Sequence, residues 1–227
     1  MEQEQTVTAP LSLYFDLQVP HGNRLRPALI GTHGYEGNKE SMMRIVTQIA
    51  QDDMIAASLQ GPYQFWTGAE SRANRRVGFG WGTSYRGAES VKLHHHAMRQ
   101  LIERLVEDHH ADPERIFLLA FSQSCSYNYR FAFSHPGLVR GVIAVCGGIP
   151  SDWQENESYC RGLVHVLHIA ATEDHWYSHE RNERFRRDLP LRAASTDFRF
   201  YQSPHKFPRN AIPHIRKWID ERVVLKP

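Results

Sequence analysis

The chain has 227 residues, of which 41% are hydrophobic and 23% charged, and its formal net charge is +2. This composition supports a packed core and excludes a largely disordered chain. The charge is too small to indicate a nucleic-acid-binding protein, which usually carries a clustered basic face. Three cysteines, with no C-x-x-C pair among them, indicate neither a disulfide framework nor a zinc site.

The first residues, MEQEQTVTAP, lack the basic start and the apolar core of a secretion signal. No apolar run in the chain approaches the roughly 18 residues that a membrane-spanning helix needs. We therefore expect a cytoplasmic protein without a membrane span, present as a monomer or a homodimer.

Apolar runs typical of strands recur along the chain, and most are nearly continuous, as in strands that are covered on both faces. They occupy residues 28–34, 54–62, 115–122, 141–149, 163–170 and 198–202. Helical patterns alternate with them, at residues 39–51, 90–109, 124–134, 178–188 and 210–223. A leading segment, residues 11–20, favours one or two strands at an antiparallel edge. This alternation predicts an α/β fold, with a mostly parallel central sheet and helices on both faces.

Residues 62–90 interrupt the alternation. They are rich in glycine, arginine and aromatic residues and show no periodicity. Loops of such length are usually functional. We expect a single domain, residues 1–227, in which this stretch forms a loop that partly covers the site. Its arginines suit either a solvated loop or contact with an anionic substrate.

Polar residues follow three of the predicted strands. Ser122 follows the third, Asp174 the fifth and His205 the sixth. In a parallel sheet, ligands bind beyond the carboxyl ends of the strands, so these three side chains are expected at one edge. A serine, an acid and a histidine in this chain order are typical of a nucleophile, its orienting acid and its base.

Several stretches of the sequence resemble the α/β-hydrolases, and within them the small phospholipase/carboxylesterase family that includes the acyl-protein thioesterases. The matching stretches are THGYEGN, LLAFSQS, FSHPGLVRGVIAVCGGIP, LHIAATED and SPHKFP. The resemblance runs from about residue 28 to residue 220. It implies the α/β-hydrolase fold, with Ser122 as nucleophile, Asp174 as acid and His205 as base. It also implies a serine hydrolase that cleaves small carboxylic esters through an acyl-enzyme, as carboxylesterases do.

The turn around the serine departs from the usual G-x-S-x-G pattern, because Ala120 and Ser124 stand where glycines are expected. Alanine and serine are the next smallest choices, so the turn can form with slight strain. The altered turn leaves open a non-catalytic binding protein with the same fold. The same three residues also serve thioesterases and peptidase-like hydrolases, and an isolated Ser122 would suit a helix N-cap.

An ester hydrolase also needs two N–H donors for the oxyanion of its intermediate. One is expected from the backbone of Gln123, at the start of the helix that follows Ser122. The resemblance implies that the backbone of Tyr35 supplies the other. Aromatic residues of the strand-end loops are candidates for the substrate walls: Phe65, Trp66, Trp81 and Trp176.

Histidines elsewhere in the sequence are candidate metal ligands. His94, His95 and His96 are consecutive, and successive helical residues point about 100° apart, so they cannot jointly chelate one ion. His175 and His179 are four residues apart but belong to no H-E-x-x-H pattern. The stretch GTHGYEG lacks the G-x-G-x-x-G spacing of a dinucleotide loop. We therefore expect no metal and no cofactor.

Overall fold

A seven-stranded sheet forms the centre of the computed structural model, which describes residues 3–68 and 75–223. The strand order is β1-β3-β2-β6-β7-β8-β9. These strands are β1 (Phe15–Gln18), β2 (Arg26–Thr32), β3 (Ile55–Leu59), β6 (Ala111–Phe121), β7 (Gly141–Val145), β8 (His165–Glu173) and β9 (Ser195–Pro204). All neighbouring strands pair in parallel except β1, which runs antiparallel to β3 at one edge. The predicted mostly parallel sheet with an antiparallel leading strand is confirmed.

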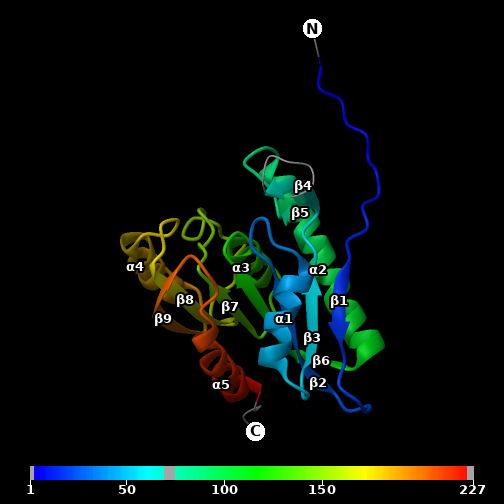
Figure 1. Ribbon diagram of the computed structural model, residues 1–227, viewed down its shortest axis with the longest axis vertical. Coiled ribbons are helices and arrows are strands. Elements are labelled where there is room, and N and C mark those ends of the chain that lie inside the picture. The colour runs from blue at the N-terminus through cyan, green and yellow to red at the C-terminus, as the bar shows by residue number, and fades with distance from the viewer. Residues whose placement is uncertain (1–2, 69–74, 224–227) are drawn as a thin grey trace.

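Helices cover both faces of this sheet (Figure 1). One face carries α1 (Lys39–Ala50) and α5 (Ile212–Val223), and the other carries α2 (Gly87–His109), α3 (Ser124–Ser134) and α4 (His179–Asp188). All five helices coincide with predicted segments. Within the part of the chain that the structure describes, none of these helices has the length and apolar character that crossing a bilayer requires.

Residues along β6 show why the sheet needs both layers of helices. Leu118 and Ala120 pack into the core under α2 and α3, whereas Phe117 and Leu119 pack under α1 and α5. All four are fully buried. A strand covered on both faces is apolar at successive positions rather than at alternate ones, which is the pattern seen in the sequence.

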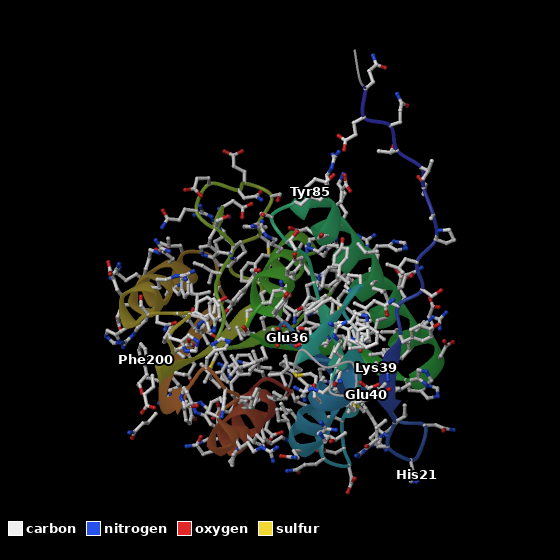
Figure 2. The ribbon with its side chains drawn as sticks, turned by 45° about the horizontal axis from the view of Figure 1, so that its top comes forward. His21, Glu36, Lys39, Glu40, Tyr85 and Phe200 are labelled. Atoms are coloured by element: carbon white, nitrogen blue, oxygen red, sulfur yellow. The ribbon has the colours of Figure 1, made fainter. Side chains whose placement is uncertain are left out.

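The start of α1 is held by side-chain contacts. Asn38 Oδ1 accepts a hydrogen bond from the N–H of Ser41 at 2.8 Å, as an N-cap does. Lys39 and Glu40 lie beside one another there, with Lys39 Nζ 2.8 Å from a Glu40 carboxylate oxygen (Figure 2). Lys39 Nζ also donates to Asp16 Oδ1 of β1 at 2.6 Å. These contacts fix the end of the loop between β2 and α1, which carries part of the site.

A two-stranded antiparallel hairpin, β4 (Tyr63–Gly68) and β5 (Arg75–Gly80), projects beyond the sheet at the top of Figure 1. The prediction of an irregular loop over residues 62–90 is therefore wrong for these strands. Ladder pairing such as Phe65 opposite Gly78 satisfies the backbone there. The apolar alternation typical of a strand is missing from β5, because Gly78 and Gly80 have no side chains at alternate positions. Residues 69–74 of the predicted loop lie outside the described residues.

Candidate active site

Ser122 lies at the sharp turn between β6 and α3. Its backbone φ is 57°, in the left-handed region that is uncommon for residues other than glycine. Such a conformation costs roughly 1–2 kcal/mol and is found where the surrounding structure holds it. One restraint is the hydrogen bond from the Ser122 N–H to the carbonyl of Val145 at 2.9 Å. The turn places the Ser122 hydroxyl beyond the carboxyl end of the sheet.

The three residues predicted from the sequence come together at that edge. Ser122 Oγ lies 2.8 Å from His205 Nε2. The other ring nitrogen, His205 Nδ1, lies 2.7 Å from Asp174 Oδ2. The side chain of Asp174 is fully buried. A proton on Nδ1 is the arrangement that the carboxylate favours, and it leaves Nε2 free to accept the serine proton.

Two aromatic rings pack near the His205 ring. Phe121, which directly precedes the serine, has its ring centroid 5.4 Å from that of His205. Tyr177 stacks on His205 at 6.0 Å and an interplanar angle of 21°. Burial raises the pKa of Tyr177 to about 12, so its phenol stays neutral beside the imidazole. These contacts restrict the rotation of the imidazole and keep Nε2 directed at Ser122.

Two glycines let neighbouring loops approach the serine closely. A Cβ on Gly34 would lie 2.8 Å from the Phe121 ring and 3.3 Å from Ser122 Cβ. A Cβ on Gly147 would lie 2.5 Å from the Ser122 carbonyl oxygen. Any larger residue at either position would push its loop away from Ser122. The loop after β2 is thereby placed directly beside the serine, as an oxyanion-binding loop requires.

Gln123 follows the serine, and its side chain joins the turn to the segment after β5. Its Oε1 accepts from the N–H of Trp81 at 2.9 Å, and its Nε2 donates to the carbonyl of Gly82 at 2.8 Å. From the sequence, only the backbone of Gln123 was expected at the site, and this side-chain contact was not predicted. The signal for it was weak: a long amide side chain directly after the candidate nucleophile.

His33 fixes the loop that carries Tyr35, a role that the sequence analysis missed. His33 Nε2 accepts from the N–H of Gly61 at 2.9 Å, so the ring proton sits on Nδ1 and is donated to the carbonyl of Gly34 at 2.7 Å. Burial lowers the pKa of His33 to about 4, so the ring is neutral at pH 7. Trp81 Nε1 donates to the His33 carbonyl at 2.7 Å. The loop is therefore set before any substrate arrives.

No protein-family model and no curated protein sequence matches this chain. Solved structures do match. A carboxylesterase from Bacillus cereus is 14% identical with a TM-score of 0.70, over 92% of this chain and 94% of that one. A carboxylesterase from Mesorhizobium loti is 15% identical with a TM-score of 0.72, over 95% and 98% of the two chains. A phospholipase/carboxylesterase from Dyadobacter fermentans is 16% identical with a TM-score of 0.70, over 93% and 98%.

The chain has the α/β-hydrolase fold. In this fold the nucleophile occupies a strained strand-to-helix turn at the top of the sheet, which is where Ser122 lies. The fold predicted from the sequence resemblance is therefore confirmed.

The aromatic residues proposed as substrate walls differ in their exposure to solvent within this α/β-hydrolase fold. Trp81 is fully buried, so the prediction that it lines the substrate site is wrong. Its indole is committed to the His33 carbonyl and lies beneath the loop rather than at the surface. Phe65 is half-buried and stacks on Tyr35 with ring centroids 4.8 Å apart. Trp66 and Trp176 are exposed, and their place at the substrate walls stays a prediction.

A small, mainly apolar cavity lies between the loop after β2, helix α1 and the loop that follows β9. Its volume is about 200 Å³. Its apolar lining comes from Tyr35, Met42, Ile45, Phe121 and Phe207. Phe121, which directly precedes Ser122, is part of this lining, whereas Ser122 is not.

The histidines considered as metal ligands do not assemble into a site. In residues 3–68 and 75–223, no group of three or more histidine, cysteine, aspartate or glutamate side chains is arranged to hold an ion. His94 is fully buried, and its Nε2 lies 3.2 Å from Asn128 Oδ1. His179 is exposed and lies 4.0 Å from a Glu183 carboxylate oxygen. The contact with Asn128 occupies Nε2 of His94.

Proposed function

We propose that the chain is a serine hydrolase that cleaves carboxylic esters through an acyl-enzyme intermediate. One observation carries the proposal: hydrogen-bond distances run without a break from Asp174 through His205 to Ser122 Oγ. A serine hydroxyl is a weak nucleophile until a base takes its proton, and this chain of contacts supplies the base and orients it.

In the first half of the reaction, Ser122 Oγ attacks the ester carbonyl carbon while His205 Nε2 takes its proton. The carbonyl oxygen becomes an oxyanion, for which the backbone N–H groups of Gln123 and Tyr35 are the proposed donors. Each such donor contributes about 10²–10³ in rate because it faces the charge only as it develops. Asp174 stabilises the imidazolium that forms.

In the second half, the imidazolium of His205 protonates the leaving alcohol, and the carbon–oxygen bond of the ester breaks. The acyl group stays on Ser122. A water molecule then enters, His205 takes its proton, and the hydroxide attacks the acyl carbonyl. Collapse of the second intermediate releases the carboxylic acid and returns the proton to Ser122. Side chains, the two backbone N–H donors and water account for every step of this reaction.

The cavity lined by Phe121, next to Ser122 in the chain, would receive a short apolar part of the substrate. A volume of about 200 Å³ lies below the range typical of drug-sized ligand sites. Solved structures with the same fold include carboxylesterases, which fits an ester substrate. We further propose that the protein works in the cytoplasm, a reducing compartment that suits its three free cysteines.

Hydrolysis of p-nitrophenyl esters by the wild type and by Ser122→Ala tests the proposal. The variant is expected to lose a factor of about 10⁴ or more in kcat, because the attacking atom is gone. Ser134→Ala is the matched control, since this serine ends helix α3, which begins two residues after Ser122. Thioesters and amides of the same acyl group, assayed in parallel, identify the preferred bond. Equal activity in wild type and Ser122→Ala would refute the mechanism.

A further inference from the structure

Ser124 occupies the second position after the nucleophile, where the usual turn has a glycine. Its side chain is fully buried. The Ser124 hydroxyl accepts a hydrogen bond from the N–H of Phe121 at 3.2 Å and lies 2.8 Å from the carbonyl oxygen of Thr32. It also lies 3.1 Å from the Phe121 carbonyl. A hydroxyl has a single hydrogen, and the shortest of these distances assigns it to Thr32.

These contacts bridge two strands at the point where they part. In the ladder between β2 and β6, the last paired residues are Thr32 and Ala120. Beyond this pair, β2 leads into the loop that carries Tyr35, and β6 leads into the turn at Ser122. The Ser124 hydroxyl stands between the Phe121 N–H and the Thr32 carbonyl, accepting from one and donating to the other. It therefore links the two segments directly beneath the site.

A second layer of buried polar groups supports this bridge from the α2 side. Thr32 Oγ1 accepts from Asn128 Nδ2 at 3.0 Å, and Asn128 Oδ1 lies 3.2 Å from His94 Nε2. Thr32, Asn128 and His94 are all fully buried. Burial lowers the pKa of His94 to about 3, so the ring is neutral and its proton on Nε2 is donated to Asn128. The acceptor side of the bridge is thus fixed by hydrogen bonds rather than by packing alone.

We propose that Ser124 is a positioning residue that sets the separation of the two oxyanion donors, Gln123 and Tyr35. This inference rests on the proposed function. The Gln123 N–H lies directly before Ser124 in the chain, and Tyr35 lies three residues after Thr32. A bridge between Ser124 and Thr32 therefore connects the two segments that carry the donors. An error of about 1 Å in such a geometry can cost about 10² in rate.

Two substitutions of Ser124 distinguish an effect of its hydrogen bonds from an effect of its side-chain volume. Ser124→Ala fills the space with a methyl group and leaves the Thr32 carbonyl and the Phe121 N–H without their partner. Ser124→Gly leaves room for a water molecule, which can accept from one group and donate to the other. We expect kcat to fall by about 10–100-fold in Ser124→Ala, with KM within about twofold, and to stay within about threefold of wild type in Ser124→Gly.

The readout is kcat per active site, titrated with a fluorophosphonate, with Ser134→Ala as the control on the same helix. A substitution that only unfolds part of the protein lowers the number of titrated sites but leaves kcat per site unchanged, and that result would overturn the proposal. If Ser124→Ala does not fold, Ser124→Cys replaces it, because a thiol fills the position but is a weak donor and acceptor. The same fall in kcat per site is expected.

Amide exchange of the Phe121 N–H tests the bridge without any catalysis. Exchange should be faster in Ser124→Ala than in wild type and Ser124→Gly, because the acceptor is lost. Unchanged protection in Ser124→Ala would show that the bridge does not hold this turn. A wild type that hydrolyses no ester would instead contradict the proposed function, and the exchange result would still decide whether the bridge exists.

Discussion

The carboxylate of Asp174 divides its two oxygens between His205 and its own loop. Oδ2 lies 2.7 Å from His205 Nδ1, while Oδ1 accepts from the backbone N–H groups of Trp176 at 2.8 Å and Tyr177 at 3.1 Å. The carboxylate is therefore held in one orientation by two backbone donors of its own loop. Because Oδ1 is held by these two N–H groups, Oδ2 is directed at His205.

This arrangement predicts the effect of Asp174→Asn. The two backbone N–H groups will select the amide oxygen, so the amide NH₂ will face His205 Nδ1. His205 Nδ1 must then accept a hydrogen bond from this amide, so the ring proton moves to Nε2. A protonated Nε2 cannot take the proton of Ser122. We expect kcat to fall by about 10⁴, with the fold retained.

Asp197→Asn is the matched control for that substitution. Asp197 Oδ2 lies 3.1 Å from His214 Nε2, so this aspartate–histidine pair resembles the first but belongs to β9 and α5. Esterase activity should stay close to wild type. Steady-state kinetics of the two variants compare them directly, and an equal loss in both would contradict a specific role for Asp174.

Preference for the length of the substrate's apolar chain should depend on the cavity that Phe121 lines. Ile45→Trp adds bulk on the α1 side of the cavity, whose volume is about 200 Å³. We expect kcat/KM for butyryl or hexanoyl esters to fall by about tenfold or more, and for acetyl esters by less than about threefold, because overpacking excludes only the longer chains. Met43→Trp, on the same helix but outside the cavity lining, should leave the preference unchanged.

An acyl series and an alcohol series of esters identify which side of the substrate enters the cavity. A loss confined to longer acyl chains places the acyl group there, and a loss confined to longer alcohols places the leaving group there. If Ile45→Trp changes neither series, the cavity does not receive substrate.

Thiol reagents should leave esterase activity intact. Cys125 lies three residues after Ser122, but it is fully buried, and burial raises the pKa of its thiol far above the usual value. Burial likewise raises the pKa of Cys146 to about 12. Since the thiolate is the reactive form, neither should be alkylated in the folded protein. Iodoacetamide treatment followed by intact mass and assay checks this, and inactivation matched to modification of Cys125 would contradict it.

Acid should destabilise the protein partly through His168. This ring is fully buried on β8, its Nδ1 lies 2.9 Å from the Tyr129 hydroxyl, and burial lowers its pKa to about 3. The unfolded chain binds a proton here near pH 6.5 and the folded chain does not. Stability is therefore full above about pH 6.5 and falls as the pH drops toward 3, by up to about 1.4 kcal/mol per pH unit.

His168→Phe should reduce that slope. Denaturant unfolding between pH 4 and pH 7 gives the free energy of unfolding at each pH. The variant is expected to be less stable at pH 7, because the Tyr129 hydroxyl loses its partner, but to depend less steeply on pH. A slope equal to that of wild type would show that His168 takes up its proton without unfolding the chain.

Local patterns in the sequence were sufficient for much of the fold and for the central contacts of the site. The helix predicted over residues 124–134 is α3 with the same bounds. Ser122, Asp174 and His205 could be brought together because each follows a buried strand of one parallel sheet, and such strand ends share an edge. Chain order and strand position therefore carried the necessary three-dimensional information.

Features that depend on contacts between distant segments could not be predicted. Trp81 looks like a pocket aromatic in the sequence, and only the fold shows that its N–H is required by the His33 carbonyl. The hairpin of β4 and β5 depends on cross-strand pairing rather than on an apolar repeat. The serine at position 124 looked like slight strain at a glycine site, whereas its hydroxyl bridges Phe121 and Thr32.

The proposal depends most on Ser122 being an activated nucleophile. Intact-protein mass after treatment with a fluorophosphonate tests this directly, for wild type, Ser122→Ala and His205→Ala side by side. The account predicts one adduct on the wild type, none on Ser122→Ala and a greatly slowed adduct on His205→Ala, with the modified peptide containing Ser122. An unmodified wild type, or an adduct that persists in Ser122→Ala, would contradict it.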